Sequence, residues 1–138
     1  MKLEMKENQS RINHLILLFS ATGIAFCMFL SFLFINGEST VMLIVFNLLF
    51  VSLIFPLNGT QIRKAYLLLI GNVIGLFWNY LFFLFTYLGT YYLGEFFKAL
   101  YIILNPFVNL FWIVSFWSIS LNALSYSKNR KLGVRIDN

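Results

Sequence analysis

Residues 71–89 read GNVIGLFWNYLFFLFTYLG and carry no charged side chain, which is typical of the middle of a membrane-spanning helix. In a helix with about 100° per residue, the small and polar side chains of this stretch share one face. They are Gly71, Asn72, Gly75, Asn79, Phe82, Thr86 and Gly89. The opposite face holds Val73, Phe77, Leu81, Leu84 and Leu88. In lipid, we expect the apolar face to meet acyl chains and the small face to pack against other helices.

The composition of the whole chain points the same way. Its 138 residues are 60% hydrophobic and only 11% charged, with a mean hydropathy of +0.82. A soluble domain carries about 25% charged residues, so this chain cannot cover a water-facing surface. It is therefore an integral membrane protein by composition, and the length suits one apolar bundle with no second domain.

Four apolar runs predict an all-α, antiparallel bundle of four transmembrane helices. The expected spans are 15–35, 40–57, 65–88 and 99–122, and together they make a bundle over 15–122. A polar segment, 1–14, precedes the bundle, and a basic tail, 123–138, follows it. We expect a short turn at 36–39, a second helix that Pro56 ends before a turn at Asn58-Gly59, and a loop over 89–98 with Tyr91 and Tyr92 near the membrane surface.

The basic residues predict the orientation. Three lie in 1–14 (Lys2, Lys6, Arg11), two between the second and third spans (Arg63, Lys64), and four in the tail (Lys128, Arg130, Lys131, Arg135), whereas Lys98 is the single one on the other side. Positive residues stay on the cytoplasmic side, so both termini should be cytoplasmic. This distribution explains the net charge of +5 without nucleic acid as a partner. The bias toward Phe, Ile, Leu, Asn and Lys favours a bacterial plasma membrane.

Two stripes of small residues predict close helix packing. The first span carries Ser20 and Gly23 on one face, together with Cys27 and Ser31. The third span carries a G-x-x-x-G pair, Gly71 and Gly75. Both patterns let helices approach closely. The sequence leaves open whether the glycine pair packs inside one chain or joins two copies.

The sequence offers little for catalysis, a metal or a cofactor. One His and one Cys cannot make a metal site by ligand count, and we expect no cofactor. His14 lies at the cytoplasmic edge, where it is an interfacial polar residue. The predicted span cores hold no ionisable side chain, although proton-coupled transport usually needs one. Small multidrug-resistance transporters also have four spans, but they need a glutamate in the first, and here that span has none. No enzyme activity is expected.

Asparagines are the candidate site. If each span is centred in the bilayer, Asn47, Asn79 and Asn109 all lie within about 5 Å of its midplane. A lone amide in hydrocarbon is costly, so we predict that these three bond one another inside the bundle. Contacts of Ser20 with Asn72 and of Ser31 with Asn105 should flank them, and Asn105 and Asn109 share a face of the fourth span with Trp112. The alternative is that each amide bonds the backbone of its own helix.

These features indicate a small multi-pass membrane protein without catalytic chemistry. Its expected role is contact with another membrane component, as a subunit, an accessory protein or an immunity-type protein. Its partners are the lipid bilayer and either a membrane protein or further copies of itself. The alternative is an oligomeric pore or facilitator for a small neutral solute or ion, lined by the asparagines. Closed asparagine pairs favour contact, whereas a continuous wet cavity favours the pore.

Overall fold

A computed structural model describes residues 2–57 and 59–133, with side chains over 7–57 and 59–125. All regular structure in this part of the chain is helical: α1 (Lys2–Leu30), a π-helical turn η1 (Ser31–Ile35), α2 (Gly37–Ile54), α3 (Gln61–Leu93) and α4 (Glu95–Gly133). Four helical stretches are long and apolar enough to span a membrane: Glu7–Ile35, Gly37–Ile54, Gln61–Leu93 and Glu95–Ser125. The predicted all-α fold with four such helices is confirmed. α1, α3 and α4 are longer than the predicted spans, whereas α2 has the predicted length but begins and ends three residues earlier.

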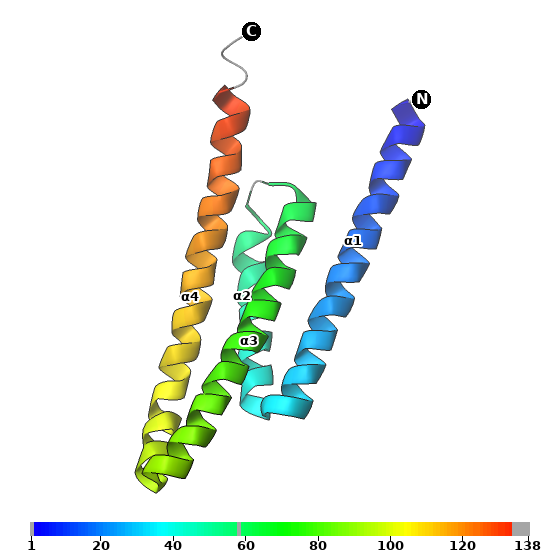
Figure 1. Cartoon of the computed structure of the whole chain (residues 1–138). Coiled ribbons are helices and arrows are strands. Elements are labelled where there is room, and N and C mark those ends of the chain that lie inside the picture. Colours follow the sequence, from blue (N-terminus) through cyan, green and yellow to red (C-terminus); the bar gives the residue numbers. More distant parts are fainter. Residues whose placement is uncertain (1, 58, 134–138) are drawn as a thin grey trace.

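α3 is the central helix of the bundle. It contacts α1, α2 and α4, whereas α1 and α4 do not touch each other in the described part of the chain. Figure 1 shows α3 between α1 and α4, with α2 behind it and with the start of α1 and the end of α4 at the same end of the bundle. The small residues on one face of α3 account for this position. Because Gly71 and Gly75 have no side chains, α2 and α4 can both pack closely against that face.

α1 continues into η1, and a turn of one residue, Asn36, joins η1 to α2. Asn36 caps α2, because its Oδ1 accepts hydrogen bonds from the Ser39 backbone N–H (2.9 Å) and the Ser39 hydroxyl (2.7 Å). This cap satisfies one of the free donors at a helix start. α2 consequently begins at Gly37, three residues before the predicted boundary of the span.

The prediction of a loop over 89–98 was wrong, because α3 continues to Leu93 and α4 begins at Glu95. Gly94 alone is non-helical there; its φ is 75° and its N–H donates to the Thr90 carbonyl at 3.0 Å. A glycine reaches this left-handed conformation without strain, so it can end α3 and let α4 begin at once. Gly89 packs against the Phe97 ring rather than breaking the helix. The two glycines of this stretch predicted a loop, whereas the helix in fact continues through Tyr91 and Tyr92.

α2 ends at Ile54, just before Pro56, as predicted from the proline. Asn58, the other half of the predicted turn, lies outside the described residues. Lys64 at the start of α3 is buried, with 2% of its surface exposed, and its Nζ donates to the carbonyls of Phe55 (2.6 Å) and Leu57. A lysine in this position satisfies the carbonyls that are free after the last turn of α2. Its positive charge also interacts favourably with the negative end of the α2 dipole.

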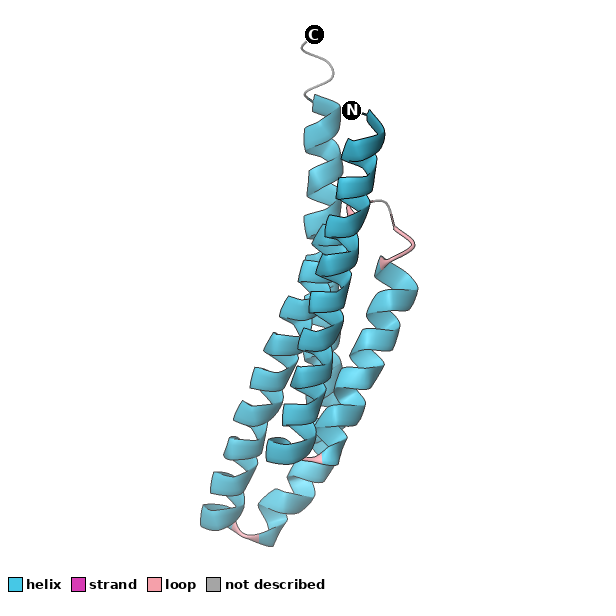
Figure 2. Cartoon of the chain, turned by 90° about the vertical axis from the view of Figure 1, so that its right-hand side faces the viewer, coloured by secondary structure: helices cyan, strands magenta, loops and turns pink. Residues whose placement is uncertain are grey.

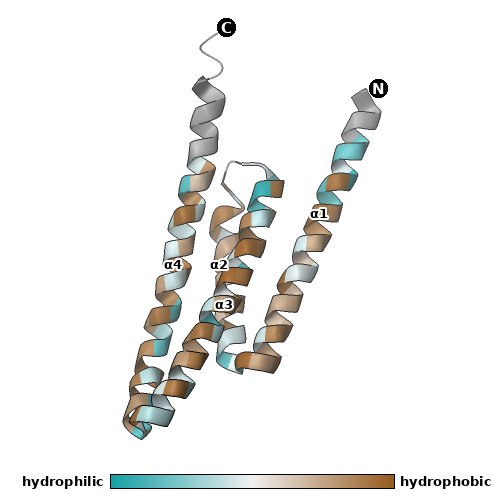
Figure 3. Ribbon diagram, in the orientation of Figure 1, coloured by the Kyte–Doolittle hydropathy of each residue, from teal (hydrophilic) through white to brown (hydrophobic). Residues whose placement is uncertain are grey.

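The core lies where α2 and α4 meet the small face of α3. Phe46 packs against Phe50, Trp112 and Phe116, with ring centroids 5.1–5.7 Å apart. Around this core, apolar side chains point outward along all four helices, and Figure 3 shows the hydrophobic colouring over the middle of the bundle. On α3, Val73, Phe77, Leu81 and Leu88 are exposed and Leu84 is half-buried, so the predicted apolar face does point away from the bundle.

The hairpin of α3 and α4 is longer than the hairpin of α1 and α2. Figures 1 and 2 show from two sides that the turn at Gly94 lies well beyond the turn at Asn36. Aromatic pairs hold the two arms together there: Phe82 with Tyr101 (5.2 Å between ring centroids) and Phe85 with Phe97 (5.4 Å).

Candidate functional site

The first buried polar group is a pair of asparagines that joins α2 to α3. Asn47 Nδ2 donates to Asn72 Oδ1 at 2.8 Å, and Asn72 Nδ2 donates to Asn47 Oδ1 at 2.7 Å. The second hydrogen of each amide goes to its own helix, to the Leu43 carbonyl (2.7 Å) and the Leu68 carbonyl (2.8 Å). Each amide has two donor hydrogens, so this pair keeps none for a solute.

A second polar chain runs from the turn end of the bundle along α4. Asn105 Nδ2 donates to Glu38 Oε2 at 2.9 Å, and Asn109 Nδ2 donates to Asn105 Oδ1 at 2.7 Å and to its carbonyl at 3.0 Å. The Trp112 indole N–H donates to Asn109 Oδ1 at 3.2 Å. Glu38 is exposed, whereas Asn105, Asn109 and Trp112 are buried. The chain therefore begins at a carboxylate on the surface and ends inside the core.

Three contacts expected from the sequence are absent from the described part of the chain. Asn79 is buried but donates to the Gly75 carbonyl of its own helix (2.8 Å), so it joins neither Asn47 nor Asn109. Ser20 likewise donates to its own helix, at the Ile16 carbonyl (2.8 Å), rather than to Asn72. Ser31 is fully buried, and its hydroxyl has no partner among these residues.

The vertical register of the helices explains this difference. Gly75 lies beside Leu43, since a Cβ on that glycine would be 2.9 Å from Leu43 Cδ2. The same antiparallel register brings Asn47 level with Asn72. The short connection after α2 sets this register, whereas centring every span in the bilayer assumed that all helices share a midpoint.

The glycine stripe of α3 is used inside the bundle. A Cβ on Gly71 would overlap the rings of Phe46 and Phe116, and a Cβ on Gly75 would be 2.6 Å from Trp112. The close approach therefore joins α3 to α2 and α4 within one chain. On α1, Ser20 is buried, and a Cβ on Gly23 would overlap the side chain of Leu69 on α3.

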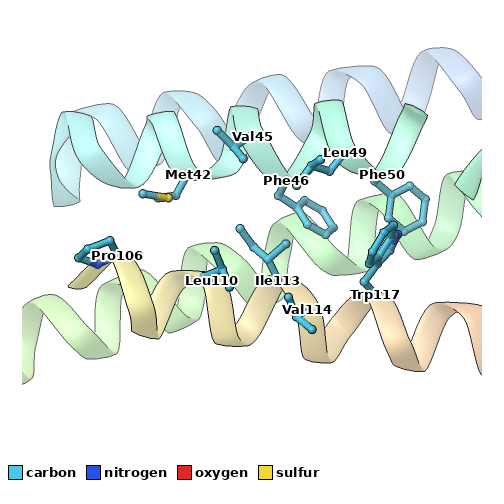
Figure 4. A pocket seen from close by; sticks show the side chains of 10 residues that line it. All are labelled: Met42, Val45, Phe46, Leu49, Phe50, Pro106, Leu110, Ile113, Val114 and Trp117. Atoms are coloured by element: carbon cyan, nitrogen blue, oxygen red, sulfur yellow. The ribbon is translucent and has the colours of Figure 1, made fainter. Parts of the chain in front are cut away.

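Two apolar grooves lie between helices. The first, of about 350 Å³, separates α2 from α4, and Figure 4 shows side chains of both helices facing across it. Its lining is Met42, Val45, Phe46, Leu49, Phe50, Pro106, Leu110, Ile113, Val114 and Trp117. The second, of about 340 Å³, lies between the end of α1 and the exposed side of α3. Neither groove is lined by a charged or amide side chain.

Reactive side chains are scattered rather than gathered. Over 7–57 and 59–125, no three His, Cys, Asp or Glu residues lie close enough to hold a metal ion. Cys27 is buried, His14 is exposed on α1, and Glu95 is paired with Lys98 at 3.6 Å. The described polar side chains hydrogen-bond within their own helices and, at Asn47–Asn72 and Glu38–Asn105, between helices.

The sequence reasoning missed two residues that organise these contacts. Glu38 falls in the turn expected at 36–39, yet it sits in the first turn of α2 and accepts from Asn105. Lys64 was read only as an orientation signal, yet it is the buried cap of α2. The polar face shared by Asn105 and Asn109 pointed to some partner, but no sequence pattern identified that partner as Glu38.

Comparisons of this chain with protein-family models, with curated proteins and with solved structures find no match.

Proposed function

We propose that this protein is a non-catalytic membrane protein that acts through contact with another membrane component, as a subunit, an accessory protein or an immunity-type protein. The observation that carries the proposal is the closure of the polar groups on one another. Asn47 and Asn72 use all four of their amide hydrogens within the bundle, and Asn109 uses both of its own on Asn105. A pore would need such groups to face a path for solute.

The grooves support the same proposal. A site that selects a polar solute needs a few convergent polar groups. The lining of the groove between α2 and α4 is apolar over its whole length, and its opening lies between two helices that are long enough to span a membrane. Such a surface suits apolar side chains from a transmembrane segment of a partner, and we place the contact there.

The orientation is part of the proposal. In the sequence, nine of the ten Lys and Arg residues fall in the first 14 residues, between the second and third spans, or in the C-terminal tail. We propose that the side with these three segments is cytoplasmic, in the plasma membrane of a bacterium. A reporter fused after Gly94 should be found outside the cell, and a reporter fused at the C-terminus should be found in the cytoplasm. The reverse pattern would contradict the orientation without touching the fold.

A flux assay separates contact from transport. The purified chain in liposomes should pass glycerol and potassium no faster than empty liposomes do. Flux that depends on the protein and falls in the Asn47→Leu variant would overturn the proposal in favour of a pore.

The contact itself is tested with a pair of tryptophan variants on α4. Leu110 lines the α2–α4 groove, whereas Ile119 is exposed at 61% and lies outside that lining. We expect native mass spectrometry of the protein from its own membranes to find a partner at fixed stoichiometry. Leu110→Trp should abolish that complex, and Ile119→Trp should leave it intact. Equal binding by both variants would exclude the groove as the contact surface.

A further inference from the structure

The exposed side of α3 carries a line of large side chains at regular spacing. From Tyr66 to Tyr91 the intervals alternate between four and three residues, which is the spacing of the contact positions in a coiled coil. Seven of the eight positions are exposed by 45–77%, and Leu84 is half-buried. We call this set the α3 line: Tyr66, Ile70, Val73, Phe77, Tyr80, Leu84, Tyr87 and Tyr91.

The α3 line lies opposite the glycine stripe of the same helix. Because Gly71 and Gly75 are enclosed by side chains of α2 and α4, they are unavailable to a second copy. Contact between copies through α3 must therefore use its other side. We propose that two copies of this chain associate through the α3 line, across a two-fold axis along the membrane normal.

Tyrosine is concentrated on this line beyond what a lipid-facing surface needs. Four of the seven tyrosines of the chain lie on it, and none of these four hydroxyls has a hydrogen-bond partner in the described part of the chain. Tyr80 and Tyr91 are about 16 Å apart along the helix axis at 1.5 Å per residue. The head-group layer is only about 5–8 Å thick on each side, so one interfacial belt cannot hold both.

A second copy can satisfy these hydroxyls. Two chains in the same membrane with the same orientation present each tyrosine at the same height. A phenol is both donor and acceptor, so equivalent tyrosines across a two-fold axis can bond each other. Near Gly94, Glu95 and Lys98 are exposed and opposite in charge, and a two-fold pair can exchange their partners.

The shape beside the line is also self-complementary. The second apolar groove, about 340 Å³, is bounded on one side by Val73, Phe77 and Tyr80 of the α3 line and on the other by residues of η1 and the end of α1. Each copy therefore presents a ridge of aromatic side chains next to a hollow. A two-fold axis places the ridge of one copy over the hollow of the other, as isologous interfaces require.

The area suits a pair. An aromatic side chain carries about 150–250 Å², so Phe77, Tyr80, Tyr87 and Tyr91 together expose several hundred Å² at their exposed fractions of 45–77%. The aliphatic residues of the α3 line add to this. The total approaches the roughly 800 Å² per partner of a standard interface.

Disulfide trapping in native membranes tests the proposal. The starting chain is Cys27→Ala, which leaves no other cysteine. Phe77→Cys and Tyr91→Cys lie on the α3 line, where a two-fold axis brings equivalent residues together. The control is Phe111→Cys on α4, which is exposed at 68% against 61% for Phe77 and lies near its depth, since Trp112 packs on Gly75.

With copper phenanthroline, we expect dimers from Phe77→Cys and Tyr91→Cys and monomers from Phe111→Cys. Native mass spectrometry of the unmodified chain should find twice the 16.1 kDa of one copy. Combining Phe77→Ala with Tyr80→Ala should weaken the dimer about tenfold, as loss of central aromatic contacts does.

Equal trapping at Phe111 and Phe77 would mean random collision and would overturn the proposal. So would a monomer that retains only lipids, or a different protein trapped at Phe77. Self-association is separate from the groove contact proposed above, whose own test uses Leu110, so failure here leaves that function standing.

Discussion

α1 and α2 are both attached to α3, but by different kinds of contact. α2 is joined by the Asn47–Asn72 pair and by the buried Lys64 in the first turn of α3, which donates to the carbonyls of Phe55 and Leu57 just after α2. The side-chain hydrogen bonds of α1 stay within α1 over the residues whose side chains are described. α1 instead packs on α3 through small residues, with Leu69 of α3 against Gly23.

The difference teaches how register is set in an apolar bundle. Lipid is as apolar as the helix surfaces, so burial alone does not fix how two helices slide along each other. A pair of amides or a buried cation is satisfied at one register only, because any shift leaves a polar group unpaired. We expect α2, α3 and α4 to form the rigid part of the molecule and α1 to be held more loosely.

The largest effect is expected from Gly71→Ala, which strikes the rigid part. Its Cβ would overlap two buried rings, Phe46 and Phe116, which pack on each other. Overpacking costs up to about 3 kcal/mol, and alanine recovers about 1 kcal/mol of helix propensity. The net loss of unfolding free energy in bicelles should be about 2 kcal/mol.

Gly37→Ala is the matched control for Gly71→Ala, because a Cβ on Gly37 would meet no atom within 4 Å. It should leave the unfolding free energy within about 0.5 kcal/mol of the parent. If the two variants lost equal unfolding free energy, the Phe46 and Phe116 rings would be able to move aside at little cost. The proposal that α2, α3 and α4 form a rigid unit would then fail.

Lys64→Met tests the polar clasp between α2 and α3. Methionine keeps the length of the side chain but cannot donate to the carbonyls of Phe55 and Leu57. Hydrogen bonds from charged groups contribute about 1.5–3 kcal/mol, and water at the end of the bundle can replace part of that, so we expect a loss of about 1.5 kcal/mol. Arg63→Met, at the exposed neighbouring position, should change the unfolding free energy little.

The fold was largely predictable because its signals are local. Hydropathy marks the four helices, and Pro56 lies in the connection that follows α2. The side of α3 that faces its neighbours follows from the alternation of Gly71 and Gly75 with large residues. The error at 89–98 has the same local origin: Gly89 and Gly94 look alike in sequence, but only Gly94 has a positive φ. Which glycine serves packing depends on Phe97, a residue of the next helix.

The polar contacts were less predictable because they depend on register. Four of the five candidate asparagines are buried, and Asn47 is half-buried. Their partners followed from the short turn after α2 and from Glu38 in the first turn of that helix. Centring every span at the bilayer midplane did not reproduce the register that pairs Asn47 with Asn72.

Double-mutant cycles measure the hydrogen bonds between helices one pair at a time. Asn47→Leu and Asn72→Leu, alone and combined, should show a coupling of about 0.6–1.7 kcal/mol, the range measured for hydrogen bonds between membrane helices. Asn79→Leu and Asn109→Leu should be additive within about 0.5 kcal/mol, because each amide is satisfied within its own helix. If only Asn79 and Asn109 were coupled, the two amides would be in contact, as their shared depth in the bilayer had predicted.

The smallest effect is expected from Gly23→Ala, where α1 meets α3. Its Cβ would overlap only the far end of the Leu69 side chain, which is half-buried and can change rotamer, unlike the two rings beside Gly71. The gain in helix propensity, about 1 kcal/mol, should offset the cost of moving Leu69. We therefore expect an unfolding free energy close to the parent value, measured in the same bicelles as Gly71→Ala. A loss as large as that of Gly71→Ala would show that small-residue packing holds α1 as firmly as the polar contacts hold α2, and the division into a rigid part and a loosely held helix would fail.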